Sequence, residues 1–262
     1  MSDRVSADRS ALGSSFGAAA AEYAEHRPDY ARAALQWALA PAPGSRVLDL
    51  GAGTGKLTAA LIELGADVTA VEPDAAMLIE LRRALPDARA VRGRAEAIPL
   101  SDSSVDAVVA GNAMHWFDMD VAGPEMARVL APGAVLAGLW NVFDDRVEWV
   151  AELVRVGGRA AIGTRDTFSR WRAVTLEAHL SSGAVALFGS PEQAEFAHEQ
   201  RRTADSLVAT FATKAGMLLM PEQQRDATLR RIRAYLASLP ETAHGEFSLP
   251  MLTGVLRLRK QR

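Results

Sequence analysis

Cysteine is absent from the sequence, and this absence removes several classes of protein at once. Disulfide-stabilised scaffolds, thiolate nucleophiles and Cys-ligated zinc centres all need a residue that this chain does not have. Histidine is scarce as well: the chain has five, and their scattered positions show no metal-ligand spacing. We therefore expect no bound metal.

Excess charge of one sign and long apolar runs are also missing. The formal net charge is −3 and the isoelectric point is near 6.0, so no basic field attracts nucleic acid or anionic lipid. No segment approaches the roughly 20 apolar residues that cross a membrane. Charges at Asp3, Arg4, Asp8 and Arg9 interrupt the region where a secretory signal would have its apolar core. We expect a cytoplasmic protein that binds neither nucleic acid nor membrane.

Apolar runs of strand length alternate with helical patterns up to Trp140. At 262 residues and 49% hydrophobic content, the chain has enough apolar material for one large α/β domain. We expect strands at 46–50, 67–72, 88–93, 104–111 and 133–140, and helices from 29 up to Pro41 and at 55–65, 74–85 and 118–130. Such alternation indicates right-handed βαβ units and a parallel sheet with helices on both faces.

After Trp140 the alternation stops. Helical patterns cover 146–180, with an interruption at Gly157 and Gly158, and then 203–215 and 221–238. Alternating segments at 194–200 and 249–260 predict two more strands. We expect this half to add a helical cap and the far edge of the sheet.

A glycine-rich turn, in "VLDLGAGTGKLT" at 47–58, follows the first predicted strand. Gly51 and Gly53 lack the Cβ atoms that would keep a ligand away from the backbone, and the next helix offers unpaired N–H groups. Asp49 lies inside the apolar strand, where a carboxylate is costly unless it is paired. We expect it to bond the turn's N–H groups or a ligand ammonium.

The turn alone leaves several ligands open. A P-loop needs one more residue between Gly51 and Gly55, and a hydroxyl where Leu57 stands. A dinucleotide site needs a third glycine where Lys56 stands. A structural turn with no ligand is the remaining alternative. Glu72 ends the second strand 21 residues after Gly51, where an acid can accept hydrogen bonds from a ribose diol; a solvated strand-end acid is the other interpretation.

Several segments together resemble class I S-adenosylmethionine-dependent methyltransferases, nearest to the methyltransferase type 11 and trans-aconitate methyltransferase-like group. They are "VLDLGAGTGKLT", "VTAVEPDAAML", "GRAEAIPLSDSSVDAVVAGNAMHWFD" and "EMARVLAPGAVLAGLWN", with weaker agreement in "FGAAAAEYAEHRPDY" and "FSLPMLTGVLRLR". The resemblance implies a Rossmann-like seven-stranded, mostly parallel sheet with helices on both faces, a helical cap, and a last antiparallel strand beside the fifth.

The pattern of elements and the resemblance together predict a division of the chain. Residues 1–12 would be a flexible tail and 13–262 a single methyltransferase domain. Within the domain, about 44–141 would bind the cofactor, an N-terminal lid at about 13–43 would close over it, and about 142–262 would form the cap and last strands. The implied cofactor is S-adenosylmethionine, leaving S-adenosylhomocysteine as product.

Site residues follow from the same resemblance, position by position. Those implied to bind the cofactor are Asp49, Gly51, Ala52 and Gly53 at the methionine and ribose part, Glu72 at the ribose, Pro73, Ala95 and Glu96 at the adenine, Asn112 near the methyl, and Tyr23 and Arg27 from the lid. One position departs from the pattern. Many relatives have an aspartate where Arg94 stands, and a guanidinium cannot accept a bond from the adenine amino group.

The acceptor is the part of the reaction that the sequence specifies least. We expect methyl transfer to a small-molecule carboxylate or hydroxyl, with O-methylation favoured by the resemblance. A hydroxyl needs a base, and His115 is the candidate by its near-neutral pKa, although packing of the loop is the alternative. A non-catalytic cofactor-binding protein and an NAD(P)-dependent oxidoreductase remain rival interpretations.

Overall fold

The computed structural model describes residues 28–163, 165–180 and 187–261. In chain order its elements are α3 (Arg32–Leu39), β1 (Arg46–Leu50), α4 (Lys56–Glu63), β2 (Asp67–Glu72), α5 (Ala75–Ala84), β3 (Arg89–Arg92), β4 (Val105–Gly111), η1 (Met114–Trp116), α6 (Met119–Val129), β5 (Leu130–Phe143), α7 (Glu148–Ala161), α8 (Phe168–Leu180), β6 (Glu192–Thr203), α9 (Ala204–Ala212), α10 (Ala215–Leu218), α11 (Glu222–Ala237) and β7 (Glu246–Arg259).

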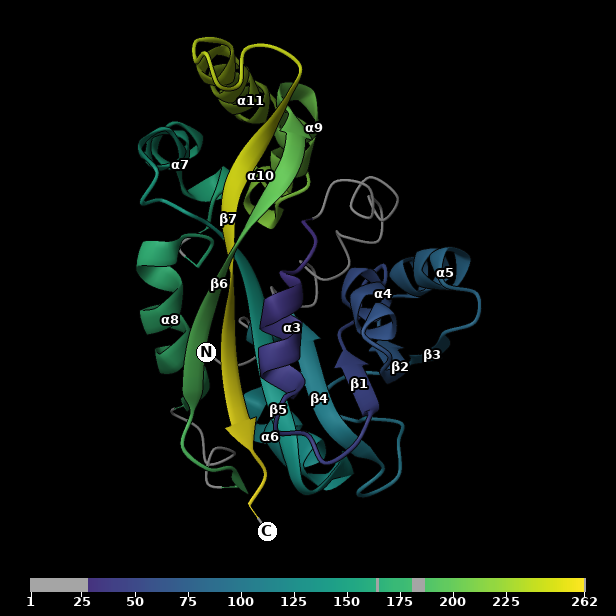
Figure 1. Ribbon diagram of the computed structural model, residues 1–262. Coiled ribbons are helices and arrows are strands. Elements are labelled where there is room, and N and C mark those ends of the chain that lie inside the picture. The colour runs from purple at the N-terminus through teal and green to yellow at the C-terminus, as the bar shows by residue number, and fades with distance from the viewer. Residues whose placement is uncertain (1–27, 164, 181–186, 262) are drawn as a thin grey trace.

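Seven strands form one sheet in the order β3-β2-β1-β4-β5-β7-β6 (Figure 1). The strands β1 to β5 pair in parallel, while β7 lies antiparallel between β5 and β6. This arrangement confirms the expected seven-stranded, mostly parallel sheet and the antiparallel strand beside the fifth. It brings the carboxyl ends of β1, β2, β4 and β5 to one edge, which is where open α/β sheets bind ligands.

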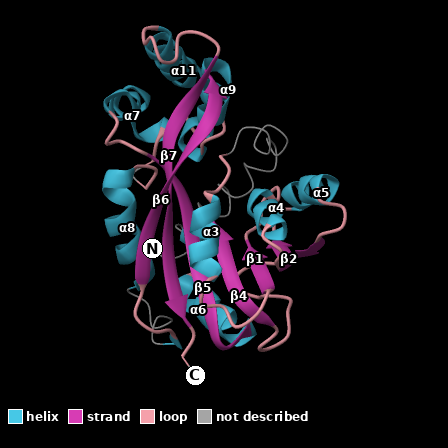
Figure 2. Ribbon diagram, viewed as in Figure 1, coloured by secondary structure: helices cyan, strands magenta, loops and turns pink. Residues whose placement is uncertain are grey.

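Helices cover both faces of the sheet, because alternate strand residues point to opposite sides (Figure 2). Leu35, Leu61, Val109 and Leu139 belong to the core that α3 and α4 share with one face. On the other face, α6 and α8 pack over a separate core. Asp74 caps α5 as its position suggests, accepting the N–H groups of Ala76 and Met77 at 2.9 Å each.

The strand β5 is longer than the predicted 133–140. Beyond Leu139, where its pairing with Gly111 of β4 ends, β5 continues as far as Phe143 because β7 still pairs with it, up to Phe143 opposite Met251. The last residues of β5 are therefore paired with β7 alone. The extra residues carry Asn141 past the end of β4, close to the candidate site.

A third core surrounds the ends of β5, β6 and β7 that project beyond the parallel strands (Figure 1). It is formed by α7, α9, α10 and α11, with Phe143 stacked on Phe211 at a centroid distance of 5.8 Å. The interruption predicted at Gly157 and Gly158 is present: Gly158 has φ of 64° inside α7. The helices expected after Trp140 thus pack on an antiparallel ribbon.

Candidate functional site

The glycine-rich turn after β1 is fastened to β2 through its own backbone. The N–H groups of Gly51 and Ala52 donate to the carbonyl of Val71 at 2.8 and 3.1 Å. Gly51 has φ of 74°, and a Cβ there would stand 2.8 Å from the Cβ of Ala113. Gly53 has φ of 58°, and a Cβ built on it meets no atom within 4 Å. The turn therefore needs glycine for its conformation and leaves open space beside Gly53.

Glu72 is bonded to the same turn. Its Oε2 accepts the N–H of Gly53 and its Oε1 accepts the N–H of Asp74, both at 2.8 Å. Burial raises the pKa of Glu72, and the two N–H bonds oppose that rise. Since each carboxylate oxygen has a second acceptor position, both can still receive hydroxyl donors.

Asp49 is 1% exposed and only half satisfied. The Thr58 hydroxyl donates to Oδ2 at 2.6 Å, while Oδ1 has no hydrogen-bond partner within the described residues. Burial raises the pKa of Asp49 to about 7, and the charge of Glu72 adds to the rise against the Thr58 bond. A buried acceptor in this state fits a ligand with an ammonium or another strong donor.

The segment after β3 forms the next wall. Ala95 is buried, and Glu96 accepts the guanidinium Nε of Arg94 at 3.1 Å and the N–H of Asp118 at 3.0 Å. Burial raises the pKa of Glu96, but these bonds outweigh it and the net shift is downward. Arg94, at the position that departs from the family pattern, thus holds Glu96 in place.

Arg128, which sequence reasoning missed, holds the segment after β3 in place through hydrogen bonds to its backbone. Arg128 of α6 donates to the carbonyls of Ile98 and Leu100 at 2.9 and 2.8 Å. Glu125 accepts the N–H of Ile98 at 2.9 Å and pairs with Arg128. The spacing of an acid and an arginine three residues apart on a helix was the available signal. Pro73, which follows Glu72, is exposed.

Asn112 follows β4 in the left-handed conformation, with φ of 50°. Its Nδ2 donates to the hydroxyl of Tyr30 at 3.1 Å, and its Oδ1 accepts the N–H of Asn141 at 3.3 Å. A Cβ on Gly111 would stand 2.4 Å from the Tyr30 hydroxyl oxygen. The phenol therefore occupies the end of β4, beside the residue expected near the methyl.

Tyr30 is held there by a short segment, residues 28–31, which we call the strap. Asn141 Nδ2 donates to the carbonyls of Pro28 and Asp29 at 3.2 and 3.1 Å. Gln200 Nε2 donates to the same Asp29 carbonyl at 3.1 Å, and the N–H of Ala31 donates to Thr253 Oγ1 at 3.0 Å. Sequence reasoning missed these residues, because their side chains come from β5, β6 and β7 and share no local motif.

His115 lies in η1, three residues after Asn112, and is half-buried. Its ring is tilted against that of Trp116, with centroids 4.8 Å apart. The two lid residues expected to contact the cofactor, Tyr23 and Arg27, lie outside the described residues. The structure brings together the turn, Glu72 and Asp49 directly, and links Asn112 to the strap.

Comparison with known proteins agrees with this geometry. A family model described as a methyltransferase domain matches residues 48–138. An uncharacterised methyltransferase of Mycobacterium tuberculosis is 42% identical over 244 residues, covering 93% of this chain and 94% of the relative. The chain belongs to the class I methyltransferase family.

Two further relatives widen the comparison. The malonyl-[acyl-carrier protein] O-methyltransferase of Enterobacter lignolyticus is 37% identical over 133 residues, covering 50% of this chain and 53% of that protein. A solved structure from Anaeromyxobacter dehalogenans, described as a candidate type II methyltransferase, has a TM-score of 0.60 and 25% identity, covering 90% of this chain and 97% of its own. The family's fold is therefore present over nearly the whole chain.

None of the helices within residues 28–163, 165–180 and 187–261 is long and apolar enough to cross a bilayer. The same ranges contain no group of three or more His, Asp or Glu side chains that could hold a metal ion.

Proposed function

We propose that the protein transfers a methyl group from S-adenosylmethionine to an oxygen of a small-molecule acceptor. The observation that carries the proposal is the pair of buried carboxylates at the glycine-rich turn. Asp49 has an unsatisfied Oδ1, and Glu72 is bonded to Gly53 while both of its oxygens keep acceptor capacity. One acid suits the ammonium of the methionine part and the other suits the ribose diol.

The remaining walls fit the other parts of this cofactor. Gly51, Ala52 and Gly53 would take the methionine and ribose part against their backbone. Ala95 and Glu96, with Pro73 at the outer side, would border the adenine. Asn112 would face the methionine part near the methyl. The dinucleotide alternative is disfavoured because Lys56, rather than a third glycine, begins α4.

When bound, the cofactor supplies a methyl group on a cationic sulfur, and its neutral product is a good leaving group. The chain's own residues then have to align the acceptor oxygen and exclude water, which accounts for most of the acceleration. A carboxylate acceptor needs no base, so His115 would shape the wall beside Asn112. O-methylation has a precedent in the malonyl-[acyl-carrier protein] O-methyltransferase.

Equilibrium binding tests the cofactor first. Calorimetric titration with S-adenosylhomocysteine should give saturable binding, and titration with NADP should give none. Binding of NADP without binding of S-adenosylhomocysteine would identify an oxidoreductase instead. Incubation with labelled S-adenosylmethionine and a panel of small acids and alcohols then tests transfer. Cofactor binding without label transfer to any member would favour the non-catalytic rival.

A further inference from the structure

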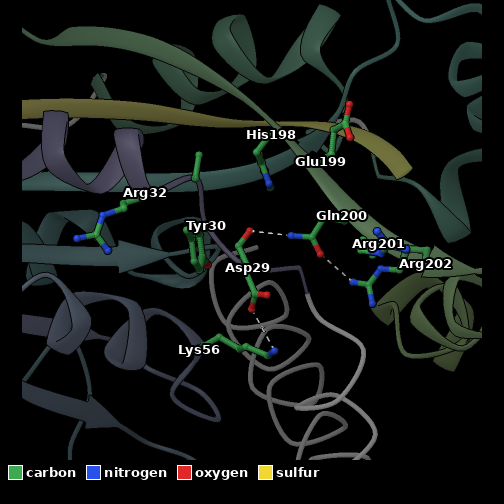
Figure 3. A pocket seen from close by; sticks show the side chains of 10 residues that line it. Asp29, Tyr30, Arg32, Lys56, His198, Glu199, Gln200, Arg201 and Arg202 are labelled. Atoms are coloured by element: carbon green, nitrogen blue, oxygen red, sulfur yellow. Dashed lines mark hydrogen bonds and ion pairs between the residues drawn. The ribbon is translucent and has the colours of Figure 1, made fainter. Parts of the chain in front are cut away.

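The strap, residues 28–31, is bordered on one side by a cavity of about 460 Å³ (Figure 3). The residues that line this cavity include Asp29, Tyr30, Lys56, Gln200 and Arg202. Packing does not enclose the strap on the side of the cavity, so its position depends on the hydrogen bonds that it receives from the sheet. Figure 3 shows one of these bonds, from the Gln200 side chain to the Asp29 carbonyl.

Asn141 of β5 donates two more of these bonds. Its side-chain amide bonds the carbonyls of Pro28 and Asp29 at 3.2 and 3.1 Å. Its Oδ1 accepts the hydroxyl of Thr253, the residue directly opposite on β7, at 2.8 Å. Asn141 is 8% exposed and Thr253 is fully buried. Every polar atom of the Asn141 amide therefore has a partner, and both of its N–H hydrogens are bonded to the strap.

Thr253 fixes the orientation of that amide. The Thr253 hydroxyl donates its one hydrogen to Asn141, and one of its lone pairs accepts the N–H of Ala31 at 3.0 Å. His198 Nε2 lies 3.3 Å from the same oxygen and carries a hydrogen there, because the hydroxyl has none left to donate. A flipped Asn141 amide would direct its NH₂ group at a hydroxyl without a free lone pair, and its oxygen at two carbonyls. The network therefore allows one orientation of Asn141.

The amide of Asn112 depends on Asn141 in two ways. The backbone N–H of Asn141 donates to Asn112 Oδ1 at 3.3 Å, and Asn112 Nδ2 donates to the Tyr30 hydroxyl at 3.1 Å. Tyr30 belongs to the strap that the Asn141 side chain holds. These two bonds use one hydrogen and one lone pair of the Asn112 amide and leave one of each. The remaining N–H and lone pair, at the residue expected near the methyl, are fixed in direction while both bonds are intact.

We propose that Asn141 is a positioning residue for methyl transfer: its side chain holds Tyr30 in place, and Tyr30 orients the Asn112 amide toward the reacting groups. The inference rests on the proposed function. Loss of the Asn141 side chain leaves the backbone bond to Asn112 intact but releases the strap, so the Asn112 amide gains freedom to rotate. A misoriented polar group beside the methyl slows the transfer step more than it weakens cofactor binding.

The test uses the full-length protein with isotope-labelled asparagine, because Asn112 and Asn141 are the two asparagines of the sequence. Asn141→Leu keeps a branched side chain without polar groups. It removes one pair of side-chain amide signals from the nuclear magnetic resonance spectrum and so assigns the other pair to Asn112. In Asn141→Leu and in Tyr30→Phe, the Asn112 Nδ2 hydrogen should exchange with water faster by about tenfold or more. The double variant should exchange no faster than Tyr30→Phe, because both substitutions act on the same bond.

A matched control and a kinetic comparison separate positioning from general loss of structure. Gln193→Met also removes a side-chain amide, but Gln193 bonds the carbonyl of Arg172 rather than the strap, so the Asn112 exchange rate should not change. In Asn141→Leu, affinity for S-adenosylhomocysteine should change by less than about threefold. In the same variant, kcat toward an acid or alcohol labelled by the unaltered protein should fall by about fivefold or more.

Several results would overturn the proposal. They are an unchanged Asn112 exchange rate in Asn141→Leu, additive effects in the double variant, an unchanged kcat, and equal losses of kcat and S-adenosylhomocysteine affinity. If Asn141→Leu fails to fold, Thr253→Val replaces it, because it removes the hydroxyl that orients Asn141. The Asn112 exchange rate should then rise and Thr253→Ser should restore it; an unchanged rate in Thr253→Val would again overturn the proposal. Failure of the proposed function is recognised separately, as absence of S-adenosylhomocysteine binding or of methyl transfer in the unaltered protein.

Discussion

The turn after β1 and the far end of β6 approach the same strap, but one presents backbone and the other presents side chains. At the turn, glycines adopt positive φ and their N–H groups bond Val71 and Glu72, and the two carboxylates lie on adjacent parallel strands. At β6, the Gln200 side chain donates to the Asp29 carbonyl of the strap, more than a hundred residues earlier, and the Arg202 side chain donates to Gln200. A backbone site needs a fixed local sequence, whereas a side-chain site can be assembled from any segments that the fold brings together.

The first prediction separates the third core, formed by α7, α9, α10 and α11, from the cofactor side. Phe211→Ala should lower the free energy of unfolding by about 3–5 kcal/mol, because it empties a fully buried ring position. The affinity of the folded protein for S-adenosylhomocysteine should not change. Urea unfolding and calorimetry measure the two quantities, with Leu219→Ala, at a side chain 66% exposed, as the control. If Phe211→Ala also lowered the affinity for S-adenosylhomocysteine, packing of this core and cofactor binding would be energetically coupled.

The second prediction concerns Glu72. Glu72→Ala should weaken S-adenosylhomocysteine binding by about 2–3 kcal/mol, because charge-assisted bonds to the ribose are lost together with the bond that orders Gly53. Glu80→Ala, on the helix that follows, serves as the control for a removed surface charge. An unchanged dissociation constant in Glu72→Ala would refute the ribose role.

The third prediction is a pH dependence that originates from Asp49. Its carboxyl, with a pKa of about 7, is mostly protonated at pH 6, and a bound ammonium requires the ionised form. Affinity for S-adenosylhomocysteine should therefore be roughly tenfold weaker at pH 6 than at pH 8. The raised pKa also means that Asp49 lowers the free energy of unfolding as pH rises from about 4 to 7. Asp49→Asn should flatten both dependences, and a slope that survives the substitution would exclude Asp49 as its source.

The fourth prediction tests the residue that links the two regions. Tyr30→Phe removes one hydrogen bond to Asn112 and keeps the ring, so activity should fall by a factor equivalent to about 1 kcal/mol. If the strap positions the acceptor, the loss should appear in the acceptor's KM or in kcat and leave S-adenosylhomocysteine affinity unaltered. If Tyr30→Phe instead weakened only the binding of S-adenosylhomocysteine, Tyr30 would contribute to cofactor binding and not to positioning of the acceptor.

The smallest effect is expected at His115. With a carboxylate acceptor no base is needed, so His115→Ala should change the rate by no more than about threefold. This change is far smaller than the roughly 10²–10⁴-fold that a positioned base contributes. The shape of the pH–rate profile should stay the same. A profile that loses its alkaline-rising limb would instead make His115 the base for a hydroxyl acceptor.

Much of the first half could be predicted because its signals are local. The strands β1 and β2 have the predicted bounds, and α5, which Asp74 caps, lies within the helix expected at 74–85. The strap could not be predicted in the same way. Asn141 extends past β4 only because β7 continues the pairing of β5, and Thr253 reaches Ala31 across 222 positions of sequence. Such contacts depend on register, which no single segment specifies.

By itself, the sequence determined the βαβ order, the glycine-rich turn and the acid at the end of β2. Each of these follows from side-chain periodicity or from the missing Cβ of glycine within a few residues. Only the tertiary structure decided that Asp49 keeps an unsatisfied oxygen, that Tyr30 rests over Gly111, and that Lys56 and Arg202 face one cavity. Burial and charge proximity are properties of packed surfaces, and those surfaces form only when segments distant in the sequence pack together.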